Sequence, residues 1–205
     1  MRYVSSVAAA IVVTVFCFAV PARAGILIEP YVGYNLLAST MTFGAGAGGA
    51  LDGQSVKLSD TGLGYGLRLG YSLPMVFFAA DYSMSNLSSS VTEKPAGSTV
   101  TTEASTGTSL GVTVGLDLPL LRPYVGYILD DQVKNDSATT SGSGFKAGIG
   151  ISMLPLIRVN LEYLTRTWTK SKSSSGVEES FGSAATYKSV SDSGLFLNLS
   201  IPFSL

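Results

Sequence analysis

The end of the chain, from Gly194 to Leu205, carries the pattern that most restricts its fold. Apolar side chains occupy every second position there, and small, polar or aromatic residues lie between them; the apolar set is Leu195, Leu197, Leu199, Ile201, Phe203 and Leu205. Because side chains two apart in a strand share a face, this segment predicts a β-strand with one wholly apolar face. Alternating segments of about 10 residues are the building units of membrane β-barrels. We therefore interpret it as the closing strand of a barrel.

The same alternation recurs along the chain and predicts further strands. Polar or glycine-rich stretches separate them in some places and short proline-containing turns in others. The predicted strands cover residues 26–38, 61–73, 76–85, 108–118, 121–130, 143–153, 156–167 and 194–205. The sequence thus predicts an all-β fold with eight antiparallel, up-and-down transmembrane strands.

Composition supports a membrane location. Apolar residues make up 46% of the chain and charged residues only 13%. No apolar run after residue 24 reaches the roughly 20 residues that a membrane helix needs. A membrane protein without such helices has to be a closed barrel, because lipid offers no partner to an open sheet edge. The rival fold is a soluble secreted β-sandwich.

The predicted strand at 61–73 favours a small barrel over a sandwich. Leucine and tyrosine form its apolar face, whereas its other face carries Gly62, Gly64, Gly66 and Gly70 beside Arg68. A soluble sandwich would carry Ser, Thr and Lys on its wet face, since glycine weakens a strand and packs nothing. Glycine suits a strand that bends sharply around a narrow lumen.

Residues 1–24 have the features of a secretory signal peptide. Arg2 provides a basic start, an apolar segment runs from Val7 to Val20, and Pro21 precedes the small-residue pattern at 22–24. We expect cleavage after Ala24 and a single barrel domain over residues 25–205. The chain's one cysteine, Cys17, falls within this leader.

The connections between predicted strands alternate in length. Long polar loops are expected at 39–58, 86–107, 131–142 and 169–190, whereas short turns are built on Pro74, Pro119 and Pro155. Membrane barrels place long loops outside the cell and short turns in the periplasm. The even strand count then predicts an outer-membrane protein with both termini in the periplasm.

Charged side chains fall on the predicted inner face of the barrel. They are of mixed sign, namely Glu29, Arg68, Asp81, Asp117, Lys146, Arg158, Glu162 and Arg166. An eight-stranded barrel is just wide enough for its side chains to fill the interior, and buried charges need partners. We expect an ion-pair plug; the alternative is a narrow polar conduit.

Aromatic side chains fall on the predicted outer face. Tyr34, Tyr65, Tyr82, Tyr127 and Tyr163 lie at comparable distances from the periplasmic strand ends, and Tyr71, Phe78 and Phe203 lie nearer to those ends. Amphipathic rings gather where the bilayer meets water, so we expect two aromatic girdles. Trp168, where a strand enters its loop, is expected to be another interface anchor.

Catalytic and cofactor chemistry finds little support. The chain has no histidine, which removes Ser-His-Asp triads and imidazole metal clusters. The adjacent carboxylates Asp130-Asp131 and Glu178-Glu179 are interpreted as solvated loop charges. With a net charge of −1 the chain has no basic footprint for nucleic acid. We expect no enzyme activity, no cofactor, no metal and no nucleic-acid partner.

Together, the leader, the eight alternating strands, the three short turns and the apolar last strand resemble the small bacterial outer-membrane barrels of the OmpA/OmpX type. The resemblance implies a structural anchor, a surface-interaction protein acting through its loops, or a small pore, here for small or hydrophobic solutes. It also implies outer-membrane lipids and the outer-membrane assembly machinery as partners of a monomer. One departure is that the chain ends in Leu205, with Phe203 and Pro202 before it, where such barrels usually end in an aromatic residue.

Overall fold

The computed structural model describes residues 24–95, 103–154 and 156–205 of the chain. Within these ranges, no helix is long and apolar enough to cross a membrane. The predicted signal peptide, apart from Ala24, lies outside the described residues, and so does the predicted turn residue Pro155.

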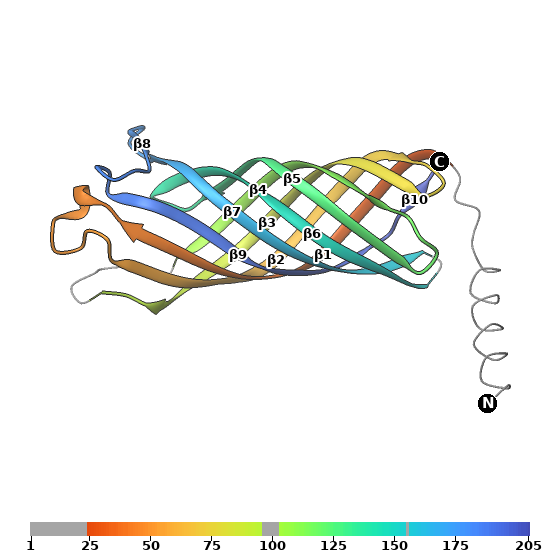
Figure 1. Ribbon diagram of the computed structural model, residues 1–205, viewed down its shortest axis with the longest axis horizontal. Helices are drawn as coiled ribbons and strands as arrows, with labels where there is room; N and C mark the ends of the chain where they lie inside the picture. The colour runs from red at the N-terminus through yellow and green to blue at the C-terminus, as the bar shows by residue number, and fades with distance from the viewer. Residues whose placement is uncertain (1–23, 96–102, 155) are drawn as a thin grey trace, which may run out of the picture.

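Eight long antiparallel strands form one closed ring (Figure 1). Each long strand pairs with the next one along the chain, and β9 pairs with both β7 and β1, which closes the sheet. Two short strands, β8 and β10, pair with β7 and β1 at opposite ends of the ring. The bounds are β1 (Gly25–Phe43), β2 (Ser55–Ser72), β3 (Val76–Glu93), β4 (Ala104–Leu116), β5 (Leu121–Lys134), β6 (Ala138–Leu154), β7 (Ile157–Ser173), β8 (Glu178–Ser180), β9 (Tyr187–Ser200) and β10 (Phe203–Ser204). The prediction of an eight-stranded up-and-down barrel is confirmed, and the two-layered sandwich is wrong.

The two ends of the barrel differ in their connections. At one end lie the short turns at 73–75 and 117–120 together with both ends of the barrel domain, where Ile26 and Leu205 exchange backbone hydrogen bonds of 3.0 Å. At the other end lie the connections at 44–54, 94–103, 135–137 and 174–186, three of which are longer than the turns, whereas 135–137 is as short as they are. The first of these contains the short 3₁₀ turn η1 (Ala45–Ala47), and the last contains β8. We call the two ends the turn end and the loop end.

The strands run further toward the loop end than the sequence predicts. β1 continues to Phe43, β3 continues to Glu93, and β6 begins at Ala138, so the strands reach well into the predicted loops at 39–58, 86–107, 131–142 and 169–190. The outward side chains of these segments are mostly polar, whereas the inner face keeps buried apolar side chains such as Phe43, Leu58 and Leu87. The pattern of apolar outer and polar inner side chains therefore fades although the backbone pairing continues. Backbone pairing, not side-chain pattern, defines the strand there.

The closing strand is also interrupted, which the sequence analysis did not predict. β9 already begins at Tyr187 and ends at Ser200, and pairing resumes in β10 at Phe203. Pro202 lies in the gap, where a proline has no N–H to donate to the ladder. The predicted single strand from Gly194 to Leu205 is therefore two strands around a proline.

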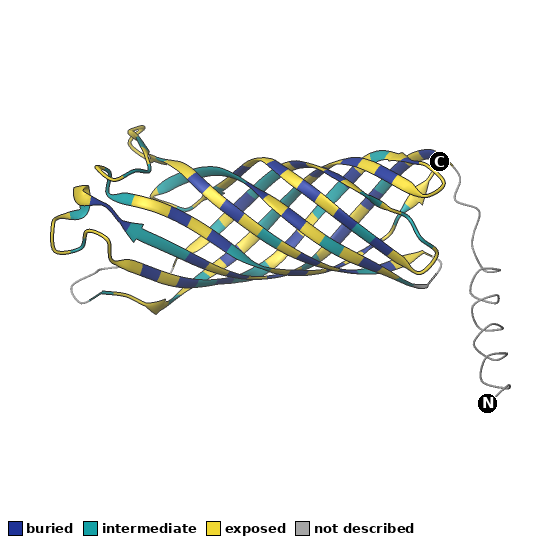
Figure 2. Cartoon of the chain, in the orientation of Figure 1, coloured by how far each residue is buried: buried dark blue, intermediate teal, exposed yellow. Residues whose placement is uncertain are grey.

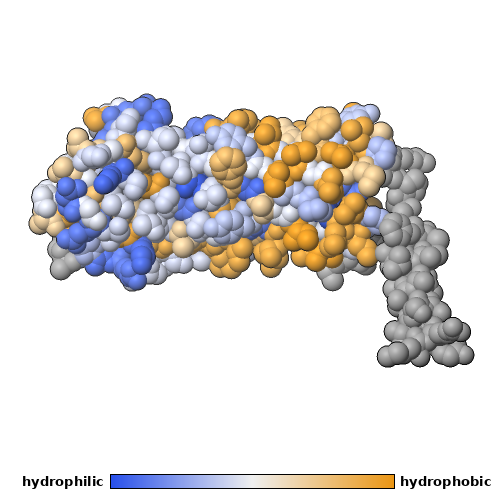
Figure 3. All heavy atoms as spheres, viewed as in Figure 1, coloured by the Kyte–Doolittle hydropathy of each residue, from blue (hydrophilic) through white to orange (hydrophobic). Residues whose placement is uncertain are grey.

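The outer surface is apolar over the turn-end half of the barrel and polar over the loop-end part. Exposed and buried residues alternate along every long strand (Figure 2), and the hydrophobic residues gather in a broad band toward the turn end (Figure 3). On β2 the outward side chains are leucine or tyrosine from Leu63 to Tyr71, followed by Thr61, Ser59 and Lys57. This apolar stretch matches the 9–11 residues with which a tilted strand crosses a bilayer, so the loop-end part of the strands, about half of the longest ones, projects beyond it.

The apolar band predicts that the energetic cost of an outward-facing charge depends on its depth in the bilayer. Val112 of β4 is outward and half exposed near the middle of the band, whereas Thr106, on the same strand and the same face, lies beyond it. We expect Val112→Arg to reduce the free energy of folding into lipid vesicles by about 2–4 kcal/mol, because the guanidinium must enter hydrocarbon. Thr106→Arg is the matched control and should cost well under about 1 kcal/mol.

Urea titration of vesicle-folded protein, followed by heat-modifiable gel mobility, measures both values. Equal losses for the two variants would contradict the assignment of the band to the bilayer.

Candidate functional site

The centre of the lumen holds an arginine bound to three carboxylates. Arg68 of β2 donates from Nε to Asp81 of β3 (2.9 Å), from Nη1 to Glu29 of β1 (3.1 Å) and from Nη2 to Glu162 of β7 (2.5 Å). All four side chains are buried. The guanidinium presents its donors in a planar fork, which lets it serve several carboxylates at once. It thereby links strands on opposite sides of the ring.

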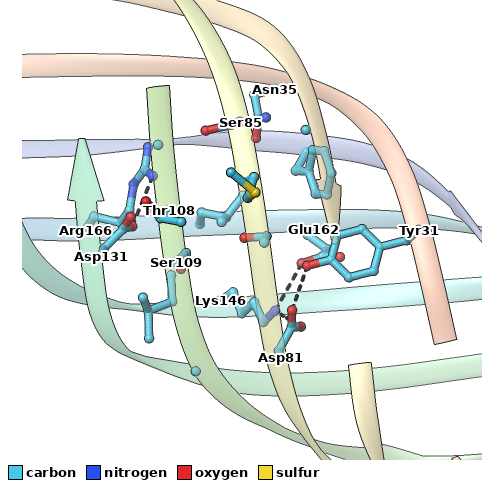
Figure 4. A pocket seen from close by; sticks show the side chains of 18 residues that line it. Tyr31, Asn35, Asp81, Ser85, Thr108, Ser109, Asp131, Lys146, Glu162 and Arg166 are labelled. Carbon is cyan, nitrogen blue, oxygen red and sulfur yellow. Dashed lines mark hydrogen bonds and ion pairs between the residues drawn. The ribbon is translucent and has the colours of Figure 1, made fainter. Parts of the chain in front are cut away.

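Neighbouring side chains complete the hydrogen bonding of this central network. Lys146 of β6 forms an ion pair with Asp81 and lies 3.8 Å from Glu162. Tyr31 donates to Asp81 (2.6 Å), and Asn198 of β9 donates to Glu162 (2.7 Å). Figure 4 shows Tyr31 and Lys146 converging on Asp81 beside Glu162. Charge-assisted bonds of this kind offset the large cost of taking the ions out of water.

A second group of charges lies toward the turn end. Arg122 of β5 pairs with Glu29, and its guanidinium carbon lies 3.4 Å from the centre of the Phe77 ring, a cation–π contact. Asp117 accepts from Arg158 at 3.3 Å and lies 3.9 Å from Arg122 Nε. Asp117 is more exposed than the other lumen charges, with 22% of its side chain accessible. The turn-end group is thus joined to the central network through Glu29.

A third group lies toward the loop end. Arg166 of β7 donates from Nε to Asp192 of β9 (2.7 Å) and from Nη1 to Asp131 of β5 (3.1 Å). Trp168 donates from its indole nitrogen to Asp192 (3.2 Å). Figure 4 shows the Arg166–Asp131 pair at a distance from the central network, with Ser109 and Thr108 near it. The lumen therefore carries charged groups at three levels.

Aromatic rings fill much of the remaining lumen. A Cβ added to Gly66 would lie 2.5 Å from the Tyr31 ring, and one added to Gly148 would lie 2.5 Å from the Tyr124 ring. The inward glycines thus make room for the large side chains paired with them on the neighbouring strand, Tyr31 opposite Gly66 and Tyr124 opposite Gly148. Between the central network and Arg166, a pocket of about 50 Å³ remains, enough for a few water molecules.

The eight lumen charges expected from the sequence all point into the barrel and take part in ion pairs. Seven of them are buried and the eighth, Asp117, is partly exposed; the seven are Glu29, Arg68, Asp81, Lys146, Arg158, Glu162 and Arg166. Four further buried charges were not predicted, namely Asp60, Arg122, Asp131 and Asp192. Asp60 and Asp192 continue the inward alternation of β2 and β9, just before the predicted starts of these strands at residues 61 and 194. Arg122 lies within the predicted strand 121–130, on its inward face, and was overlooked there.

Asp131 was missed for a different reason. The inward side chains of β5 are even-numbered from Arg122 to Ile128, but the pairing shifts between Ile128 and Asp131. This irregularity moves an odd-numbered residue to the inner face. The prediction that Asp131 is a solvated loop charge is therefore wrong, because it is buried against Arg166, whereas Asp130 is exposed.

Trp168 does not face the membrane interface, so this prediction is also wrong. Its side chain is buried in the lumen, 6% exposed, on the same face of β7 as Arg166. Strand β7 continues to Ser173, so the inward alternation that includes Glu162 and Arg166 extends to Trp168. The other adjacent pair, Glu178-Glu179, lies in β8 at the loop end, where Glu178 pairs with Lys170 at 3.1 Å.

The aromatic residues expected in the girdles lie on the outer surface. All of them are at least 38% exposed, and they are Tyr34, Tyr65, Tyr71, Phe78, Tyr82, Tyr127, Tyr163 and Phe203. The Tyr127 and Phe145 rings meet edge to face with centroids 4.8 Å apart, and the Tyr71 and Phe78 rings stack at 6.1 Å. Whether they meet the two lipid interfaces stays a prediction.

Among the described residues, no group of three or more His, Cys, Asp or Glu side chains is arranged to hold a metal ion. The carboxylates that come together in the centre of the lumen bind Arg68 and Lys146 instead.

Comparison with known proteins finds a family profile and similar solved structures. A family profile described as "Outer membrane protein beta-barrel domain" matches residues 8–200. Neisserial surface protein A is similar in structure, with 16% identity, a TM-score of 0.48 and coverage of 88% of this chain and 99% of the other. The outer membrane protease OmpT from Escherichia coli shows 9% identity, a TM-score of 0.37 and coverage of 87% and 97%.

A search of curated proteins finds no match. The family profile spans nearly the whole chain, and the structure shows its fold, a closed ring of strands with an apolar exterior and a charged lumen. This chain belongs to the outer membrane protein β-barrel domain family and is an outer-membrane β-barrel protein.

Proposed function

We propose that this protein is a plugged barrel with a structural or surface-interaction role, exerted through its loop end. The observation that carries the proposal is the contact of Arg68 with three carboxylates across the lumen. Such a network holds opposite walls together and leaves a pocket of about 50 Å³. No part of this role requires a catalytic step, a cofactor or a nucleic-acid partner.

The proposed orientation places both termini and the short turns in the periplasm. It is supported by the clear difference between the turn end and the loop end, since membrane barrels carry their longer connections outside the cell. The projecting halves of the strands would then stand above the outer leaflet. They would present Ser- and Thr-rich walls and four connections to the surroundings.

We further propose that the protein is a monomer surrounded by outer-membrane lipid and inserted by the outer-membrane assembly machinery. The exposed apolar side chains are distributed over all eight long strands. Lipid can therefore surround the described barrel on every side, and no strand presents a polar surface to a second protein subunit. The outward tyrosines would anchor this band at its edges.

A narrow pathway for small solutes is the second candidate. The small pocket between the charged levels is lined partly by hydroxyl groups, including Ser83, Ser85 and Ser109. These would hydrate a passing solute if the central ion pairs rearranged. If the lumen is such a pathway, the protein should conduct ions across a membrane, whereas a plugged lumen should not.

Breaking the central network should destabilise the barrel strongly. Arg68→Met leaves Glu29, Asp81 and Glu162 with fewer positive partners in a buried site, and we expect a loss of about 3–5 kcal/mol. Lys57→Met is the control, because the Lys57–Glu93 pair is exposed and should be worth at most about 1 kcal/mol. Urea unfolding in lipid vesicles measures both, and a loss of similar size in the two variants would contradict the plug.

Conductance separates the plug from the pathway. In planar lipid bilayers, the folded wild-type protein should give no reproducible single-channel steps, because Arg68 and Lys146 bind carboxylates of facing strands across the lumen. Vesicles from the same preparation should contain heat-modifiable protein, which shows that it has inserted. Reproducible steps that change in size with Lys146→Met and remain unaltered with Lys57→Met would favour the pathway.

If the role is exerted through the loop end, a folded barrel with shortened loop-end connections should not be able to perform it. We expect a variant in which Asn-Gly turns replace residues 45–52 and 175–185 to fold into the outer membrane but to restore neither surface adhesion nor detergent resistance to a deletion strain. The control replaces residues 73–75 at the turn end, which include none of the lumen charges, and should restore both. Full restoration by the loop-shortened variant would place the role in the barrel itself.

A further inference from the structure

A second, larger cavity lies inside the projecting end of the barrel, on the loop side of Arg166. Its volume is about 270 Å³, and apolar side chains supply much of its wall, including Met41, Leu58, Leu87 and Val190. A cavity of about 150 Å³ is enough for benzene, and ligand pockets begin near 300 Å³. The space therefore fits a small organic molecule.

The charges around this cavity are mainly negative. Asp60, Glu103 and Asp192 line it, against a single positive side chain, Arg166. The guanidinium of Arg166 is already paired with Asp131 and Asp192. The cavity thus has an excess of carboxylate that its own cation does not balance.

Asp60 is the buried carboxylate of this cavity without a positive partner. It points into the barrel from β2, it is only 9% exposed, and it accepts a hydrogen bond from Ser39. Among the described residues, no Lys or Arg nitrogen lies within ion-pair distance of it. Buried carboxylates are normally paired, because burial of an isolated charge is costly. Asp60 therefore offers a buried negative charge with which a cation from outside the protein can pair.

Aromatic side chains line the same cavity. Trp168 extends from β7, Phe181 lies in the 174–186 connection, and Tyr187 begins β9. The rings of Phe181 and Tyr187 meet edge to face at 6.2 Å, and Tyr187 stacks on Phe43 at 5.4 Å. Aromatic faces attract cations, quaternary ammonium groups in particular, and also accommodate apolar groups. The apolar and aromatic walls of the cavity and its excess of negative charge together favour one class of ligand.

We infer that the outer cavity binds a small amphipathic organic cation. Its ammonium group lies at the carboxylate of Asp60, and its apolar part packs against Trp168, Phe181 and Tyr187. An anion would meet the unbalanced carboxylates, and a neutral apolar molecule would leave Asp60 unpaired. This site would give the loop end a ligand of defined chemistry, which the proposed surface role does not specify.

Fluorescence tests the inference directly, because Trp168 is the only tryptophan of the chain. The folded full-length protein in non-ionic detergent is titrated with benzyltrimethylammonium, benzyl alcohol and benzenesulfonate at constant ionic strength. We expect a saturable change in Trp168 emission with the cation, at least tenfold weaker binding of the neutral alcohol and no saturable change with the anion.

A pair of variants locates the charge. Asp60→Asn should weaken binding of the cation by about tenfold or more, since it removes the charge but keeps the shape. Asp130→Asn is the matched control, because Asp130 is exposed outside the cavity, and the affinity should stay within about twofold of wild type. Heat-modifiable gel mobility checks that each variant is folded.

Four results would overturn the inference. Three concern the wild-type protein: equal affinity for the cation and the alcohol, binding of benzenesulfonate as tight as that of the cation, and absence of any saturable change with the cation. The fourth is an Asp60→Asn variant that folds and binds the cation as wild type does. If Asp60→Asn fails to fold, the comparison of the three ligands on the wild-type protein still tests the inference.

Discussion

The need to pair every backbone group in lipid governs this structure. A sheet inside a bilayer can have no free edge, and the pairing of β9 with β1 removes the last one. Closure then separates the two faces of every strand, one toward hydrocarbon and the other toward a narrow lumen. The apolar exterior and the charged interior are consequences of that separation, and they invert the usual arrangement of a soluble protein.

The interior of the barrel is held by ion pairs and rings in place of an aliphatic core. Arg68 binds carboxylates from three strands at one point. At Asp81, Lys146 adds a second ion pair and Tyr31 donates a hydrogen bond. Such a network stabilises little compared with apolar packing, but it tolerates only one arrangement of the strands because each partner is buried. The inward glycines serve the same packing, since they admit the rings of Tyr31 and Tyr124.

The barrel is taller than a bilayer requires, which gives it two functional halves. Toward the turn end, outward leucines, valines and tyrosines meet lipid and the lumen is filled. Toward the loop end, the outer face of the sheet is polar, and the lumen opens into a cavity of about 270 Å³ with apolar and aromatic walls and the unpaired Asp60. Strand residues supply most of its walls beyond the apolar band, and Phe181 of the 174–186 connection adds to them.

Alternation of side chains by itself determined the strand number, the closed fold and the inward direction of charges such as Glu29 and Arg68, because period two follows directly from backbone geometry. The sequence could not decide how far the strands extend, since the outward side chains turn polar beyond the apolar band while the inner face still carries buried apolar residues such as Leu58 and Leu87. It also could not place Asp131, which a break in register turns inward, or Trp168, which lies beyond the predicted strand end. Only the tertiary structure decided which charges pair across the lumen and which carboxylate stays unpaired, because partners such as Arg68 and Glu162 meet through closure of the ring and not through proximity in sequence.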